Sequence, residues 1–402
     1  MEEEIIEFLN KRNYDIRKSN NARWIDQKCT IDVLSVVADC ILEYIGDNED
    51  KEFTVKDIWF YEYTVLNVQD IFRKPNPKKQ AKNEYDKWFG QPIKLFAYSQ
   101  IITEKTKNKR HTYKVNNKKI LEYISVRDRN AMIFLNLYIG KVLLDSELLP
   151  YFNVFFEKQN KEAYKELRKK FIEFTIYNTP INGKVECGRI FAKILNPLAF
   201  TKNKKGTVKG RISKNIITND QLLYNRVNWR DTKKPKDVTR EVYEMQNPST
   251  SDKMTEYKIQ KAKKLLRKYN EKYRNGKSEV DDNGEYPSNA IHIHHIFPKA
   301  DFMEIADKLE NLIALTPTQH MVNAHDNGNT TYINKEYQHL CLIHKVSNIK
   351  ENLESPEREH IYEFDEMIHV LNEGLDTTDF SKIETMDFNS VLKIIDEKYI
   401  NE

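Results

Sequence analysis

One segment, residues 290–325, constrains this chain more than any other, because half of its histidines gather there. The 402-residue sequence has 10 His, and five of them lie in this segment: His292, His294, His295, His320 and His325. Imidazole both binds divalent metal ions and exchanges protons near neutral pH. The cluster therefore predicts a site for metal binding or proton transfer.

The spacing of the first three histidines predicts a β-strand. From Ala290 to Ile296, apolar side chains alternate with His, which is typical of a strand with two different faces. Because successive side chains point to opposite faces, His292 and His294 share one face and His295 points away from it. We expect His292 to pack beside the site, and His294 and His295 to take part in it.

A second strand and a helix are predicted further along. Leu312–Leu315 is a short apolar run, as in a buried strand. Thr316 and Gln319 have the spacing of a capping box, and Pro317 between them is favoured in the first turn of a helix. His320 is therefore expected near the N-terminus of a helix.

With Asn311 directly before the second strand, this order of elements and residues resembles the HNH (ββα-metal) nuclease family over about residues 285–346. The resemblance implies that His294 and His320 bind a divalent metal ion. It also implies that His295 is the general base that takes a proton from the attacking water. Asn311 would brace the loop and hold the base in orientation.

The third metal ligand departs from the family pattern. HNH enzymes with a further helix His usually carry it four residues after the first, but here Ala324 holds that position. Asn323 and His325 flank it. His325 has the better ligand chemistry, but it reaches the site only if the helix is distorted or ends, which residues 326–328 would allow.

The chemistry of phosphodiester hydrolysis explains these residue types. A divalent metal ion neutralises charge that builds up on the phosphate oxygens, and an imidazole with a pKa of about 6.5 can accept a proton from water. Mg²⁺ or Mn²⁺ is expected for activity, with Zn²⁺ or Ni²⁺ as alternatives. Lys299, in the loop after the first strand, is a candidate phosphate contact.

The N-terminal part is expected to be helical. Apolar residues at helical spacing predict a helix over 31–45. Thr54 and Asp57 predict the start of a second helix through a weak capping box. A third helix is expected over 83–100, with a kink or break at Pro92.

Residues 101–115 predict two short strands joined by a basic tip. Helices followed by a basic hairpin resemble a winged helix-turn-helix domain, here over roughly residues 25–125. In that family a helix enters the major groove and the hairpin lies along the DNA backbone. The candidate DNA contacts of this hairpin are Lys105, Lys107, Lys109 and Arg110.

Residues 201–236 form a second basic region. No acidic residue occurs between 201 and 219, so the local field is positive and favours a nucleic-acid backbone. Its candidate DNA contacts are Lys202, Lys204, Lys205, Lys209, Arg211, Lys214, Arg226 and Arg230. The lysines of a charged helix expected within 251–280 are interpreted instead as a solvated face.

Together these features predict an α+β, mainly helical multidomain protein. We expect a winged-helix-like DNA-binding domain over 1–125 and a helical connector with the basic segment over 126–280. A ββα-metal (HNH) nuclease domain over 281–346 and a helical extension over 347–402 would follow.

Composition excludes several other classes. No apolar run approaches about 18 residues, and the acidic N-terminus lacks the features of a secretory signal. The four Cys form no C-x-x-C pair, which fits reduced thiols and a cytoplasmic location. The net charge is only +4, from 65 basic and 61 acidic residues, so local clusters decide what the chain binds.

The chain as a whole resembles bacterial type II restriction endonucleases with an HNH site. The resemblance implies sequence-specific cleavage of double-stranded DNA that leaves 5′-phosphate and 3′-hydroxyl ends. A two-fold symmetric target site would imply a homodimer. The alternatives are a non-specific or partner-gated defence or toxin DNase, and a non-catalytic winged-helix regulator.

Overall fold

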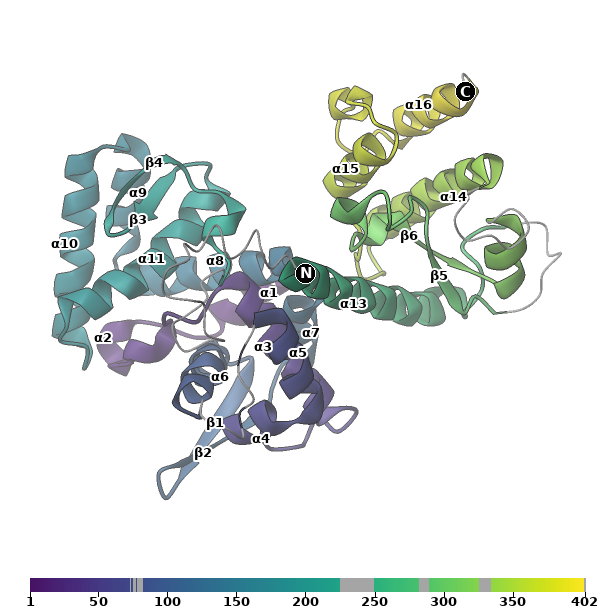
Figure 1. The fold of residues 1–402 in the computed structure, drawn as a ribbon. Coiled ribbons are helices and arrows are strands. Elements are labelled where there is room, and N and C mark those ends of the chain that lie inside the picture. The colour runs from purple at the N-terminus through teal and green to yellow at the C-terminus, as the bar shows by residue number, and fades with distance from the viewer. Residues whose placement is uncertain are drawn as a thin grey trace. The chain divides into compact units, whose positions relative to one another are not determined.

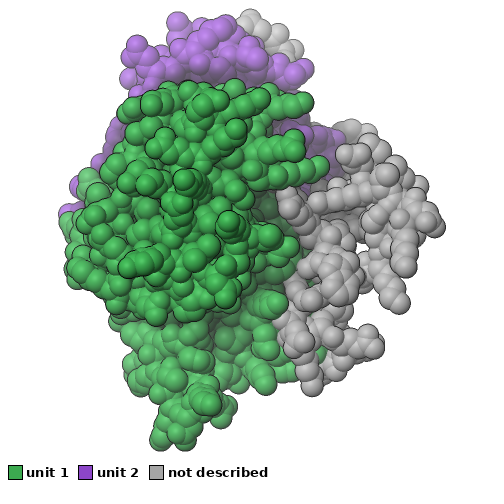
Figure 2. Space-filling view, turned by 90° about the vertical axis from the view of Figure 1, so that its left-hand side faces the viewer, with its two compact units in different colours: residues 1–247 green, residues 248–402 purple. Residues whose placement is uncertain are grey.

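The structure is a computed structural model that describes residues 1–72, 74, 77, 82–224, 249–281, 289–324 and 334–400. The chain forms two compact units, residues 1–247 and 248–402, which Figure 2 colours separately. Among the described residues, the strands form three separate two-stranded antiparallel sheets. The predicted α+β, mainly helical class is therefore confirmed at this level.

Unit 1 consists of helices and two β-hairpins (Figure 1). Its helices are α1 (Glu2–Asn10), α2 (Ile16–Ser19), α3 (Ile31–Ile45), α4 (Val55–Phe60), α5 (Glu62–Phe72), α6 (Lys82–Tyr98), α7 (Lys118–Val126), α8 (Asp128–Asp145), α9 (Leu149–Lys158), α10 (Lys161–Asn178) and α11 (Lys184–Thr201). Its hairpins pair β1 (Ile102–Lys107) with β2 (Arg110–Val115), and β3 (Lys205–Val208) with β4 (Arg211–Ile216).

Helix α3 has the bounds that the apolar spacing predicted. It ends at Gly46, whose φ of 58° is favourable for glycine. The helix packs against α7 and α8. Because it is covered on several sides, Asp32 and Asp39 are buried as well as the apolar stripe.

The two further predicted helices, α4 and α6, begin and end close to their expected positions, whereas α5 between them was not predicted. The backbone N–H of Thr54 donates to Asp57 Oδ2 (2.7 Å) and the Asp57 N–H donates to Thr54 Oγ1 (3.3 Å), so the predicted capping box is confirmed. Helix α6 continues through Pro92 and is not split there.

The predicted hairpin over 101–115 is present and extends away from the helices of unit 1 (Figure 1). Asn108 and Lys109 form its turn with φ values of 51° and 63°, the positive-φ pair of a tight hairpin turn. Phe53 and Tyr113 exchange two backbone hydrogen bonds of 2.9 and 2.8 Å. These bonds attach the second strand to the segment before α4.

The basic segment after α11 is a second hairpin, which the sequence had not indicated. Its turn contains Lys209 and Gly210, both at positive φ. Asn196 of α11 anchors it, because its Oδ1 accepts from Thr207 N (2.8 Å) and its Nδ2 donates to Thr207 O (3.0 Å). A side chain at Gly206 would meet Asn196 Oδ1 at 2.5 Å, so glycine permits this close packing.

Unit 2 surrounds one small sheet with helices. Its elements are α13 (Ser249–Arg274), β5 (His292–His295), β6 (Leu312–Leu315), α14 (Lys335–Glu354), α15 (Phe364–Gly374) and α16 (Phe388–Ile400). Strands β5 and β6 pair antiparallel, with His294 opposite Ile313. Leu266 of α13, Ile313 and Leu342 of α14 belong to one apolar core.

Two features of unit 2 differ from the predicted segmentation. Helix α13 was expected in a connector, but it packs against β5 and β6 within unit 2. The predicted segments 281–346 and 347–402 also belong to this one unit. Among the described residues, no helix has both the length and the apolar character needed to cross a membrane.

Candidate functional site

The predicted alternation of histidines along β5 is present. His292 and His294 both place their rings against His320, at centroid separations of 4.8 and 5.1 Å. His295 instead contacts the carbonyl of Ala306. The strand therefore presents two imidazoles to the segment after β6 and a third to the loop before it.

The rings of His294 and His320 have a geometry that fits a shared metal ion. Their planes are inclined by 72°. Two imidazoles on one tetrahedral ion, each with a nitrogen about 2.1 Å from it, have centroids roughly 5 Å apart, which matches the observed 5.1 Å. Within the described ranges, no group of three or more His, Cys, Asp or Glu side chains could hold a metal ion.

The segment that carries His320 begins as predicted but continues differently. The N–H of Thr316 donates to Gln319 Oε1 (3.0 Å) and the Gln319 N–H donates to Thr316 Oγ1 (3.2 Å), which confirms the capping box. Residues Gln319–Asn323 then form a π-helical turn, in which Ala324 N donates to Gln319 O (2.9 Å). The predicted ligand His325 lies outside the described residues.

The π turn bears on the departure from the family spacing. In a π-helix the backbone bond joins residues five apart instead of four. The segment that carries His320 is therefore distorted from α-helical geometry between Gln319 and Ala324. Position 325 follows this turn and lies outside the described residues.

Asn311 has the contacts that a loop-bracing residue needs. It is fully buried directly before β6. Its Oδ1 accepts from Phe297 N (2.8 Å), and its Nδ2 donates to the carbonyls of Phe297 (3.1 Å) and Ile305 (3.3 Å). The start and the middle of the loop after β5 are thus bonded to one amide, which holds the loop next to His295.

His295 is held in one tautomer and stays neutral. Its Nε2 lies 3.1 Å from Ala306 O, and because a carbonyl only accepts, Nε2 carries the proton and Nδ1 keeps its lone pair. Burial, followed by the positive charge of Lys263, lowers the pKa of His295 to about 4. The ring is therefore neutral at pH 7, the state that a general base requires.

Two lysines lie beside His295, and only one of them was a candidate. Lys299, the predicted phosphate contact, forms an ion pair with Glu256 of α13. Lys263 follows Glu256 by two helical turns and so shares its helix face. Burial lowers the pKa of Lys263, and no ion pair involves it in the described part of the chain. The interpretation of the α13 lysines as a solvated face is wrong for this residue.

The candidate DNA contacts of the first hairpin fall into two groups. Lys105 Nζ pairs with Glu52 Oε1 at 2.6 Å, so its charge is neutralised within the protein. Lys107, Lys109 and Arg110 are exposed at the turn. Among the described residues, these three have no acidic partner. The uncompensated charge is therefore at the tip.

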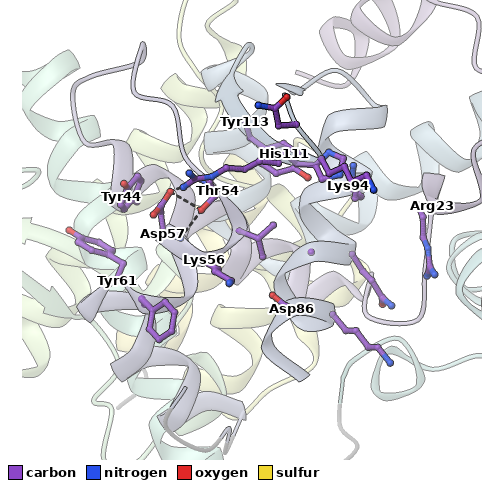
Figure 3. A pocket seen from close by; sticks show the side chains of 18 residues that line it. Arg23, Tyr44, Thr54, Lys56, Asp57, Tyr61, Asp86, Lys94, His111 and Tyr113 are labelled. Atoms are coloured by element: carbon purple, nitrogen blue, oxygen red, sulfur yellow. Dashed lines mark hydrogen bonds between the residues drawn. The ribbon is translucent and has the colours of Figure 1, made fainter. Parts of the chain in front are cut away.

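A groove of about 1130 Å³ lies between this hairpin, α4 and α6 (Figure 3). Lys56 of α4 and Lys87 of α6 line it together with the hairpin tip. Asp57, one of its acidic residues, is bonded to Thr54 (Figure 3). Sequence reasoning missed Lys56 and Lys87, because each is a single lysine on a helix without a neighbouring cluster.

The second hairpin places most of its predicted contacts on the surface. Lys202, Lys209, Arg211 and Lys214 are exposed, whereas Lys204 and Lys205 are half-buried. No ion pair involves these six residues within the ranges that the structure describes. Arg226 and Arg230 lie outside the described residues.

No known protein family, curated protein or solved structure matches the chain. The features of the chain that bear on function are its own: two imidazoles that converge, a third held neutral, and two basic hairpins.

Proposed function

We propose that the chain is a metal-dependent, restriction-type DNA endonuclease with an HNH site. It would hydrolyse phosphodiester bonds of double-stranded DNA and leave 5′-phosphate and 3′-hydroxyl ends. The observation that carries this proposal is the convergence of His294 and His320, rings 5.1 Å apart that come from segments separated by a strand and a loop.

His294 and His320 would hold the divalent ion, with His325 as the proposed third ligand. When bound, Mg²⁺, Mn²⁺, Zn²⁺ or Ni²⁺ supplies positive charge that stabilises the phosphate oxygens. Two imidazoles with no carboxylate favour the transition metals, while open positions also admit Mg²⁺.

The chain's own residues supply the proton transfer and the positioning. Nδ1 of His295 accepts a proton from the attacking water, while Nε2 remains bonded to Ala306 O. Asn311 keeps the loop fixed during this step. Lys263 would place positive charge near His295, where the phosphate gains negative charge in the transition state, while Lys299 is paired with Glu256.

Unit 1 supports the DNA-binding part of the proposal. Helices α3, α4–α5 and α6 are followed by a basic hairpin that the Phe53–Tyr113 bonds attach to them, an order that resembles a winged helix. The groove lined by Lys56, Lys87 and the hairpin tip would face the DNA backbone. The second hairpin, with Lys209 and Arg211, would add further phosphate contacts. A symmetric target site would require a homodimer.

Cleavage of a plasmid by the purified chain, with Mg²⁺ or Mn²⁺, tests the proposal. Discrete fragments support a restriction-type enzyme, and a smear supports a non-specific or partner-gated DNase. Intact DNA that is nevertheless bound supports the winged-helix regulator. His295→Ala should bind DNA normally but cut on the order of 10²–10⁴-fold more slowly. Normal cutting by this variant would refute the assignment of the base.

A further inference from the structure

His292 takes part in the histidine cluster in a different way from His294. Its ring stacks on that of His320, with centroids 4.8 Å apart and planes only 12° from parallel. His294 meets the same ring edge-on, at 72°. Both histidines lie on the same face of β5, two residues apart.

The parallel arrangement excludes His292 as a partner of His320 on one ion. The lone pair of an imidazole nitrogen lies in the plane of its ring, so two rings bind one ion only if their planes intersect near it. The planes of His292 and His320 are almost parallel, whereas those of His294 and His320 cross.

The stack restricts the rotation of the His320 ring. The final side-chain torsion of His is broad, so its ring is easily turned. His292 is in turn held by strand pairing, because it lies opposite Leu315 in the β5–β6 register. A ring fixed on a strand thus supports a ring that extends from the less regular π turn.

We propose that His292 is the positioning residue of the metal site: its stacked ring orients His320 so that this ligand and His294 meet on one imidazole-preferring divalent ion. This inference rests on the proposed function, because it assumes that His294 and His320 are ligands. It assigns His292 a role through its ring face, and not through its nitrogen atoms.

Titration of the full chain with Co²⁺ alone tests this role by calorimetry and by the visible absorption of the bound ion. His292→Ala, which removes the stack, should weaken Co²⁺ binding about tenfold. His292→Phe keeps a flat ring but has no nitrogen, so binding should stay within about threefold of wild type, with an unchanged Co²⁺ spectrum.

His339→Ala is the matched control. His339 also stacks on an aromatic ring in unit 2, that of Tyr399, at 4.7 Å and 15°, but it belongs to α14 and takes no part in the cluster. The His339→Ala variant should therefore bind Co²⁺ with the wild-type affinity. Thermal unfolding of each variant shows whether the chain has remained folded.

Each other outcome overturns the inference. If His292→Ala binds Co²⁺ as wild type does, the stack has no role. If His292→Phe loses as much affinity as His292→Ala, a nitrogen of His292 is required and the residue is a ligand. A wild-type chain that binds Co²⁺ and cuts DNA, with an unaffected Ala variant, refutes this inference alone. A wild-type chain that binds no Co²⁺ refutes the metal site, and this inference with it.

Discussion

Asp32 is a carboxyl group buried within unit 1. It lies in the first turn of α3 with 4% of its surface exposed, and its Oδ2 accepts a hydrogen bond from Tyr224 N at 2.8 Å. Burial, followed by the negative charge of Asp128, raises its pKa from 3.8 to about 6. The folded chain therefore binds a proton here that the unfolded chain releases at lower pH.

This pKa sets how stability depends on pH. The stabilisation of the folded chain by protonated Asp32 is fully present below about pH 3.8 and is lost as the pH rises through about 6. Above pH 6, the buried, ionised Asp32 lowers the unfolding free energy by on the order of 3 kcal/mol. We expect Asp32→Asn to raise the unfolding free energy of unit 1 at pH 8 and to have little effect at pH 4. Tryptophan fluorescence in urea measures this selectively, because all four Trp lie in residues 1–247. If Asp32→Asn raises the unfolding free energy equally at pH 4 and pH 8, the pKa of Asp32 is not raised in the folded chain.

Other residues show why part of the site could be predicted. The positions of His294, His295, Asn311 and His320 in the candidate site could be predicted, because their types and spacing are tied to local strands and to a capping box. The position of Lys263 near His295 could not, because it depends on what packs against α13. Helical periodicity identifies a face of a helix but not its neighbour in the fold.

At the scale of elements, α13 places a cation, Lys263, near His295. Lys263 is half-buried and is in no ion pair among the described residues, whereas Lys299 is paired with Glu256. We expect Lys263→Gln to slow single-turnover cleavage on the order of 100-fold, since a fixed positive charge near the reacting phosphate is lost. DNA affinity, measured by anisotropy without a cleaving metal, should change little.

Lys268→Gln provides the comparison for Lys263→Gln, because Lys268 is exposed on the same helix. It should cleave at the wild-type rate. Equal losses in the two variants would mean that α13 contributes only general positive charge.

Strand β6 depends on a buried ion pair. Lys345 Nζ of α14 lies 3.1 Å from Glu279 Oε1, and each side chain is 2% exposed. The other oxygen of Glu279 accepts from Ala314 N at 2.7 Å. Lys345→Met should destabilise unit 2 by about 3–5 kcal/mol, because Glu279 is left charged and buried.

Hydrogen exchange of the Ala314 amide measures this loss. The double variant Lys345→Met with Glu279→Gln should recover part of the stability, because neither charge then remains buried. If the double variant is as unstable as the sum of the two single variants, the two residues are not energetically coupled.

The elements were predictable where local signals agree. Helix α3 and strand β6 have the expected bounds, because an apolar pattern and a clear terminator coincide. The β3–β4 hairpin was missed, because its lysines and glycines interrupt the alternation typical of strands. The π turn at Gln319–Asn323 was not foreseen either, since its start has the same capping box as an α-helix.

At the scale of the whole molecule, the net charge is small, and the unpaired positive charge of the described residues is concentrated at a few positions. Sixty-five basic and 61 acidic residues leave +4, and most basic side chains at the base of the first hairpin are paired, as Lys105 is with Glu52 and Lys114 is with Asp50. At the two hairpin tips, by contrast, the exposed Lys107, Lys109, Arg110, Lys209 and Arg211 are in no ion pair within the residues that the structure describes. DNA affinity should therefore depend on a few side chains and not on the overall charge.

Salt dependence tests this distribution. Each phosphate contact adds about 0.9 to the slope of log affinity against log salt. Replacing Lys107, Lys109 and Arg110 with Gln should lower the slope by up to about 3. The same should hold for a second triple variant of the other hairpin, at positions 209, 211 and 214. Fluorescence anisotropy with a DNA duplex and no cleaving metal gives the slopes.

A third triple variant separates local charge from total charge. Lys161, Lys165 and Lys169 are exposed on α10, where acidic residues alternate with them and Lys169 pairs with Glu173. Their replacement with Gln removes the same three charges. Because the surrounding acids already offset them, the slope should remain close to that of wild type. If all three triple variants lower the slope equally, DNA binding responds to net charge, and the hairpins have no special role in it.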